Sequence, residues 1–125
     1  MVKDMDVFVE SFRPGVMERL GLSPKQIHEV NPDVIYVRLS GYGQKDKRAG
    51  HDANYLAESG IMSKFVTTPG GKPGIPGNVV ADYINGSLAT FIKILHARRL
   101  KQQKIVIDSS MTENIMYYSQ PVLFS

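Results

Sequence analysis

Two ionisable residues occupy positions suited to proton transfer. His51 stands between Gly50 and Asp52, where a charged loop is predicted to meet the start of a helix. Asp82 follows a loop rich in glycine and proline, and it falls in the first turn of a long apolar helix. A helix start stabilises a carboxylate, whereas burial disfavours its charge, so the direction of a pKa shift stays open. Imidazole titrates near neutral pH. The pair therefore predicts acid–base chemistry, with ordinary helix capping as the competing interpretation.

Other kinds of chemistry find little support in the sequence. It contains no Gly-Lys-Ser/Thr phosphate loop, no His-Glu-x-x-His and no Gly-x-Ser-x-Gly. Gly41 and Gly43 follow a predicted strand, but residue 46 is aspartate where a dinucleotide-binding motif would have its third glycine. The three histidines are far apart and cysteine is absent, so no metal site is expected.

The composition is that of a folded domain. A chain of 125 residues fits one domain, and 42% hydrophobic with 22% charged residues argues against disorder. The net charge of +3 is too small to indicate nucleic-acid binding. Residues 1–10 show no signal-peptide pattern, and polar residues interrupt the apolar stretch 79–100. We therefore expect neither nucleic-acid nor membrane partners.

Strand and helix signals alternate along the chain. Strands are predicted at 7–10, 34–39 and 105–107, the last two buried. A short helix is predicted after Pro14, and a second begins at the capping box of Ser23 and Gln26 and ends near residue 31. Further helices are predicted at 52–59, at 79–101 and after the capping box that begins at Ser110. This order predicts an α/β fold with a small, mainly parallel sheet flanked by helices.

The longest predicted helix, 79–101, is expected to pack its large apolar side chains into the core. The expected core contacts are Val80, Ile84, Leu88, Phe91, Ile92 and Leu95.

Five segments resemble one family in sequence and in order. Residues 7–22 (VFVESFRPGVMERLGL) and 35–44 (IYVRLSGYGQ) resemble the family III CoA-transferases, also called CaiB/BaiF proteins. Residues 49–57 (AGHDANYLA) are similar to the racemase branch of that family. Residues 78–82 and 106–111 complete the match. The resemblance implies that residues 1–125 form part of a Rossmann-like large domain.

The resemblance also implies roles for individual residues. In the racemase branch the positions of His51 and Asp82 hold the acid–base pair that inverts the α-carbon of 2-methylacyl-CoA thioesters by 1,1-proton transfer. In the transferases the position of Asp82 holds a nucleophile that forms an anhydride, and the histidine is commonly replaced. The family's CoA-contacting positions correspond to Ser11, Phe12, Arg13, Arg19, Arg48, Ala49, Gly50, Asp52 and Tyr55.

Further expectations follow from the family. CoA thioester is the substrate, so no separate cofactor is expected. Full-length relatives are homodimers, and the compartment is the cytoplasm, or the peroxisome or mitochondrion in a eukaryote. The sequence departs from the family after Asp82, where only Gly86 remains of two or three glycines. Three interpretations therefore stay open: a racemase, a CoA transferase with Asp82 as nucleophile, and a non-catalytic truncated family member.

Overall fold

A single parallel sheet lies at the centre of the protein, for which we describe a computed structural model over residues 1–65 and 68–123. Within these residues the sheet has three strands, β1 (Val7–Glu10), β2 (Ile35–Ser40) and β3 (Val106–Ser110), in the order β1-β2-β3. Both pairings are parallel, and the register aligns Glu10 with Arg38 and Arg38 with Asp108. The predicted α/β fold with a small parallel sheet is confirmed.

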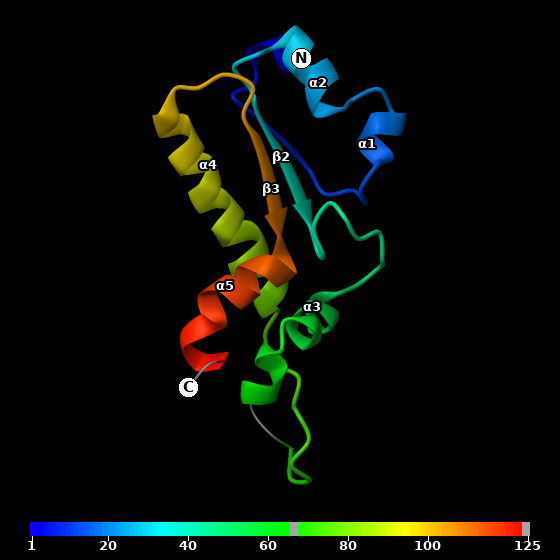
Figure 1. Ribbon diagram of the computed structural model, residues 1–125, viewed down its shortest axis with the longest axis vertical. Coiled ribbons are helices and arrows are strands. Elements are labelled where there is room, and N and C mark those ends of the chain that lie inside the picture. Colours follow the sequence, from blue (N-terminus) through cyan, green and yellow to red (C-terminus); the bar gives the residue numbers. More distant parts are fainter. Residues whose placement is uncertain (66–67, 124–125) are drawn as a thin grey trace.

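Helices connect the strands and cover the sheet (Figure 1). The described helical elements are η1 (Val2–Asp4), α1 (Val16–Arg19), α2 (Pro24–Val30), α3 (Asp52–Glu58), η2 (Ile61–Lys64), η3 (Ala81–Leu88), α4 (Ala89–Leu100) and α5 (Met111–Leu123). None of the helices in the described part of the chain has the length and apolarity needed to cross a bilayer.

Two of the three hydrophobic clusters formed by the described residues lie on opposite faces of the sheet. On one face, Ile27 of α2 packs with Val34 and Tyr36, and Phe8 of β1 stacks on Tyr36. On the other face, Ala97 of α4 packs with Ile35 and Val37, with further apolar side chains around them. Alternate residues of a strand point to opposite faces, which explains why its neighbours in sequence belong to different clusters.

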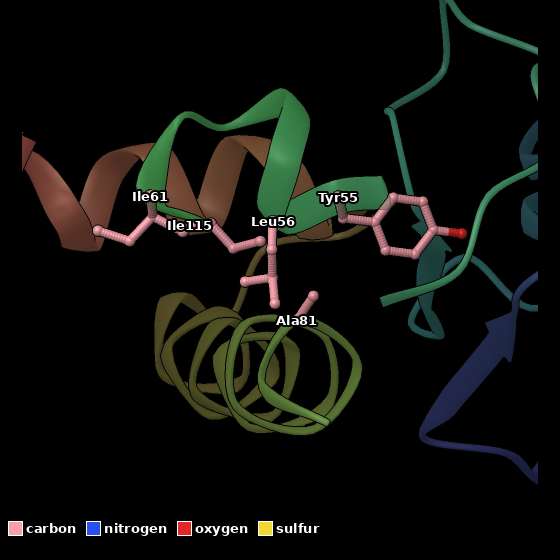
Figure 2. Close-up of a cluster of buried hydrophobic side chains, with 5 residues drawn as sticks. All are labelled: Tyr55, Leu56, Ile61, Ala81 and Ile115. Carbon is pink, nitrogen blue, oxygen red and sulfur yellow. The ribbon is translucent and has the colours of Figure 1, made fainter. Parts of the chain in front are cut away.

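The third hydrophobic cluster lies beyond the C-terminal ends of the strands. It joins α3, η2, η3 and α5 through the buried side chains of Tyr55, Leu56, Ile61, Ala81 and Ile115. Figure 2 shows Leu56 directed toward Ala81, while the ring of Tyr55 extends away from Ile61 and Ile115. This cluster fixes the starts of α3 and η3 relative to each other, and the candidate site lies at those starts.

The long predicted helix differs from its expected form in two ways. Its first part, η3, is wound as a π-helix, and α-helical winding begins only at Ala89. Its small and polar side chains face inward, so that Ala81, Asn85, Gly86, Ala89, Thr90 and Ala97 are the buried ones.

The core contacts expected for this helix are therefore largely wrong. Val80 packs against the third cluster, but the large side chains are about half exposed, namely those of Ile84, Leu88, Phe91, Ile92 and Leu95. Close packing explains the choice of face. A Cβ at Gly86 would lie 3.3 Å from both Met111 of α5 and the carbonyl oxygen of Ala81, so the helix packs tightly at this position.

The prediction that β3 is a buried strand is also corrected. The strand runs from Val106 to Ser110, and Val106 is exposed because β3 lies at the edge of the described sheet. The predicted start of α2, in contrast, is correct. The backbone N–H of Gln26 donates to Ser23 Oγ at 3.4 Å, and the backbone N–H of Ser23 donates to Gln26 Oε1 at 3.0 Å. These two bonds confirm the predicted capping box of α2.

Candidate active site

A cleft of about 280 Å³ opens at the C-terminal ends of β1 and β2. We call it the strand-end cleft. The chain leaving β1 and the chain leaving β2 form its walls, as expected for a ligand site in a parallel α/β fold. Its lining residues are Ser11, Phe12, Arg13, Pro14, Ser40, Gly41, Tyr42, Asp46, Arg48, Ala49, Gly50, His51 and Tyr55.

Two tyrosines and two glycines hold the cleft in shape. The rings of Tyr42 and Tyr55 meet edge to face with centroids 5.0 Å apart, and Tyr55 Oη donates a hydrogen bond of 2.5 Å to the carbonyl of Gly50. A Cβ at Gly41 would overlap the Tyr55 ring, and one at Gly50 would lie 2.7 Å from Tyr42 Oη. The glycines are therefore required because the rings approach the backbone so closely.

Arg48 is already engaged by two carboxylates and an aromatic ring. Its Nε lies 2.8 Å from Asp46 Oδ2 and its Nη2 lies 3.2 Å from Glu58 Oε1, and both contacts raise the pKa of the guanidinium. Its Cζ also lies 4.5 Å from the centroid of the Tyr42 ring. These contacts orient Arg48, but they leave less of its charge for a ligand than a free guanidinium would have.

Other cations gather beside the same cleft. Arg13 lines it directly, while Arg19 Nη1 and Lys47 Nζ lie 3.7 and 3.9 Å from the position that a Cβ on Gly15 would take. Gly15 follows the lining residue Pro14, so this second pair stands next to the cleft without lining it. A guanidinium binds phosphate oxygens in pairs, which makes this side suitable for a phosphorylated ligand.

One polar atom of the cleft has no partner within the described residues. Ser40 Oγ is buried and forms no hydrogen bond there, although Ser40 lines the cleft. Buried hydroxyl groups normally have a partner, so Ser40 Oγ is an exception at the wall of the cleft. Sequence reasoning missed Ser40, Tyr42 and Lys47, although the first two stand at the end of a recognisable strand, in the segment Ser40-Gly41-Tyr42.

Asp52, the first residue of α3 and the sequence neighbour of His51, contacts the start of η3. Asp52 Oδ1 accepts a hydrogen bond of 3.0 Å from the backbone N–H of Asp82, across 30 residues of sequence. The start of α3 is thereby joined to the start of η3. We call these three residues the helix-start junction: His51, which is exposed, and Asp52 and Asp82, which are half-buried.

The surroundings of Asp82 disfavour its charge. Burial is the main cause that raises the pKa of the Asp82 carboxyl, the negative charge of Asp52 adds to it, and His51 acts in the opposite direction. Asp82 in turn helps to raise the pKa of the Tyr55 hydroxyl, for which burial is again the main cause. The sequence had left the direction for Asp82 open. Functional carboxyls often have raised pKa values of this kind.

The structure places most of the predicted site residues around one cleft. Its lining includes His51 and seven of the predicted CoA-contacting residues, namely Ser11, Phe12, Arg13, Arg48, Ala49, Gly50 and Tyr55. Three predicted residues do not line it. Arg19 lies beside Gly15, and Asp52 and Asp82 belong to the helix-start junction. Over the described ranges 1–65 and 68–123, no three histidine, cysteine, aspartate or glutamate side chains are grouped to hold a metal ion.

A parallel sheet whose strand ends open into a cleft beside several cations is typical of α/β proteins that bind anionic ligands. The model of CoA-transferase family III matches residues 1–125, and the chain belongs to this family.

Curated relatives include both racemases and transferases. The chain is 46% identical over 120 residues to alpha-methylacyl-CoA racemase of Mus musculus, covering 91% of this chain and 31% of the relative. It is 42% identical over 125 residues to the protein of the same name in Homo sapiens, covering 95% and 32%. It is 40% identical over 100 residues to the probable fatty acyl-CoA transferase Rv3272 of Mycobacterium tuberculosis, covering 75% and 25%.

A crystal structure of Rv3272 has the same fold as the chain. It superposes with a TM-score of 0.81 at 32% sequence identity, over 98% of this chain and 36% of that one. The chain thus spans about a third of the length of the two racemases and of this structure.

Proposed function

We propose that this protein is an α-methylacyl-CoA racemase or a near relative, which inverts the α-carbon of 2-methylacyl-CoA thioesters. His51 and Asp82 are the two proton-transfer groups. The single observation that carries the proposal is the hydrogen bond between Asp52 Oδ1 and Asp82 N, which holds the residue next to His51 against Asp82. The 46% identity to a racemase supports the same assignment.

The reaction removes one proton from the α-carbon and returns another, so the atom count of the substrate is unchanged. One group removes the α-proton, and the electrons of the C–H bond pass into the enolate of the thioester. The other group donates a proton to the opposite face of the same carbon. An imidazole changes protonation state near neutral pH, and the raised pKa of Asp82 moves this carboxyl toward the same range.

The strand-end cleft supplies the binding part of the proposed reaction. Arg13, with Arg19 and Lys47 beside it, attracts the phosphates of CoA. His51 lines this same cleft, so a ligand bound there reaches the helix-start junction. We further propose that residues 1–125 form part of the family's large domain and that the whole protein is a homodimer. Its role would be in fatty-acid metabolism, in the cytoplasm, peroxisome or mitochondrion.

Exchange of the α-hydrogen tests this proposal directly. The purified protein is incubated in deuterated water with one epimer of a 2-methylacyl-CoA, and the thioester is analysed by NMR and mass spectrometry. We expect deuterium at the α-carbon together with loss of optical purity. If high protein concentration produces neither change, racemisation by this chain is excluded.

The transferase remains the second candidate, because the relative Rv3272 carries a transferase name and Asp82 is only half-buried. In that mechanism the Asp82 carboxylate attacks the thioester carbonyl, CoA leaves as the thiolate, and an acyl anhydride is formed. Hydroxylamine would convert this anhydride to a hydroxamate, whereas a racemase forms no covalent intermediate.

The third interpretation, a non-catalytic family member, has its own test. A cooperative thermal melt together with no CoA binding by calorimetry would favour it.

A further inference from the structure

A second hollow, of about 290 Å³, shares His51 with the strand-end cleft. It lies between the first turn of α3 and residues 75–79, and we call it the apolar hollow. Ala53, Ile75, Pro76 and Val79 give it a mainly hydrocarbon lining. Ile75 is 75% exposed and Val79 is 37% exposed, so both present apolar surface to a ligand.

The proposed substrate has two chemically different ends, and the two cavities differ in the same way. CoA is anionic, and cations gather around the strand-end cleft. The acyl end is hydrocarbon, and the second cavity is lined mainly by hydrocarbon. The α-carbon joins these ends and must lie against the acid–base pair, and His51 is the residue that lines both cavities.

We infer that the apolar hollow receives the acyl chain of the thioester, with Ala53, Ile75 and Val79 setting the chain preference. The inference rests on the proposed function for the position of the α-carbon. A volume near 290 Å³ stands at the small end of ligand pockets, so the hollow holds the part of the chain next to the α-carbon rather than a whole long chain.

Binding of straight-chain thioesters tests the inference. Dissociation constants are measured by calorimetry for CoA and for its thioesters from acetyl to decanoyl. For the wild type, each methylene that enters the hollow should tighten binding by up to about fourfold, until the hollow is full. Ile75→Ser and Val79→Ser should flatten this dependence and leave the affinity for CoA itself unchanged. Ala53→Leu, which fills the hollow, should shorten the preferred chain.

Ile92→Ser is the matched control. Ile92 is an apolar residue of α4 that is 52% exposed, and it does not line the hollow, so its replacement should preserve the chain-length dependence. A thermal melt of each variant verifies folding. Equal dependence in wild type, Ile75→Ser and Val79→Ser would overturn the inference, as would failure of every acyl-CoA to bind.

The proposed function can fail separately. Chain-length-dependent binding without α-deuterium exchange would leave the hollow as an acyl site and reject the racemase. Exchange with no dependence on chain length would retain the racemase and reject the hollow.

Discussion

The strand-end cleft and the helix-start junction are built in different ways. The cleft is lined by short stretches of neighbouring residues, 11–14, 40–42 and 48–51, with Asp46 and Tyr55 beside them. The junction depends on one contact between Asp52 and Asp82, which are 30 residues apart. The comparison teaches that pairing of two neighbouring parallel strands is enough to bring the walls of the cleft together, whereas the proposed acid–base pair needs a separate contact between two helix starts.

The largest effect is expected when one of the two proposed proton-transfer groups is removed from the helix-start junction. His51→Ala and Asp82→Asn should each lower the rate of racemisation by about 10²–10⁴-fold, the usual contribution of a positioned acid or base, because inversion needs both groups. CoA affinity by calorimetry should remain unchanged, because the cations beside the cleft are intact. Racemisation that persists in both variants would contradict the assignment.

The stability of Asp82→Asn has a definite sign. Because the folded state raises the pKa of Asp82, the stability contributed by this group is fully present below its unfolded pKa and is lost as pH rises through the folded pKa. At neutral pH the asparagine variant should therefore melt at the same temperature as wild type or higher. A clearly lower melting temperature would show that the ionised carboxylate is stabilising.

The shape of the cleft is tested by Gly41→Ala. The new Cβ would overlap the Tyr55 ring, so we expect the free energy of unfolding to fall by about 1–3 kcal/mol, and CoA binding to weaken with it. Urea denaturation measures the first effect. Gly70→Ala is the control, because a Cβ there meets no atom within 4 Å. Equal stability of the two variants would contradict the packing of Tyr55.

Two substitutions of Asp52 test the helix-start junction, one that removes its hydrogen-bond acceptor and one that removes only its charge. Asp52→Ala removes the acceptor for Asp82 N and should slow exchange by about 10–100-fold, as expected for the loss of a hydrogen bond to a charged group. Asp52→Asn keeps an oxygen acceptor but removes the charge that raises the pKa of Asp82.

For Asp52→Asn we therefore expect a near-normal maximal rate and an acid limb of the pH–rate profile that lies at lower pH than in wild type. An alanine variant as active as the asparagine variant would exclude Asp52 as a positioning residue.

The smallest effect is expected at the phosphate side of the cleft. Arg13→Gln should weaken CoA binding by about tenfold, which corresponds to one charge-assisted hydrogen bond at an exposed site. Arg48→Gln should weaken it less, because Asp46 and Glu58 already contact this guanidinium. Arg99→Gln, at the exposed C-terminal end of α4, is the control. Calorimetry at two salt concentrations measures all three. An unchanged affinity in Arg13→Gln would remove Arg13 from the binding surface.

Much of the fold follows from local signals in the sequence. The Ser23–Gln26 capping box, the strand at Ile35–Ser40 and the helix that begins after His51 were predictable, because capping and β-propensity act within a few residues. Most of the lining of the strand-end cleft was predictable as well, from the family resemblance of segments that directly follow or precede these elements.

The orientation of the long helix could not be predicted in the same way. Hydrophobicity favoured the face with Ile84, Phe91 and Leu95, and the structure leaves that face about half exposed. The buried face carries alanine, glycine, asparagine and threonine, and at Gly86 it packs closely against Met111 of α5. Periodicity identifies a helix, but the space left by its neighbours decides which side turns inward.

The sequence by itself determined the order of the strands and main helices, the family, and the residue types available for acid–base and phosphate-binding chemistry. Only the tertiary structure decided that Asp52 bonds to the start of η3, that Asp82 is buried enough to raise its pKa, and that His51 borders two cavities of opposite character. The physical reason is how far apart in the chain the interacting residues lie. Capping and strand formation depend on neighbours in the chain, whereas desolvation and cavity shape depend on atoms that only folding brings close.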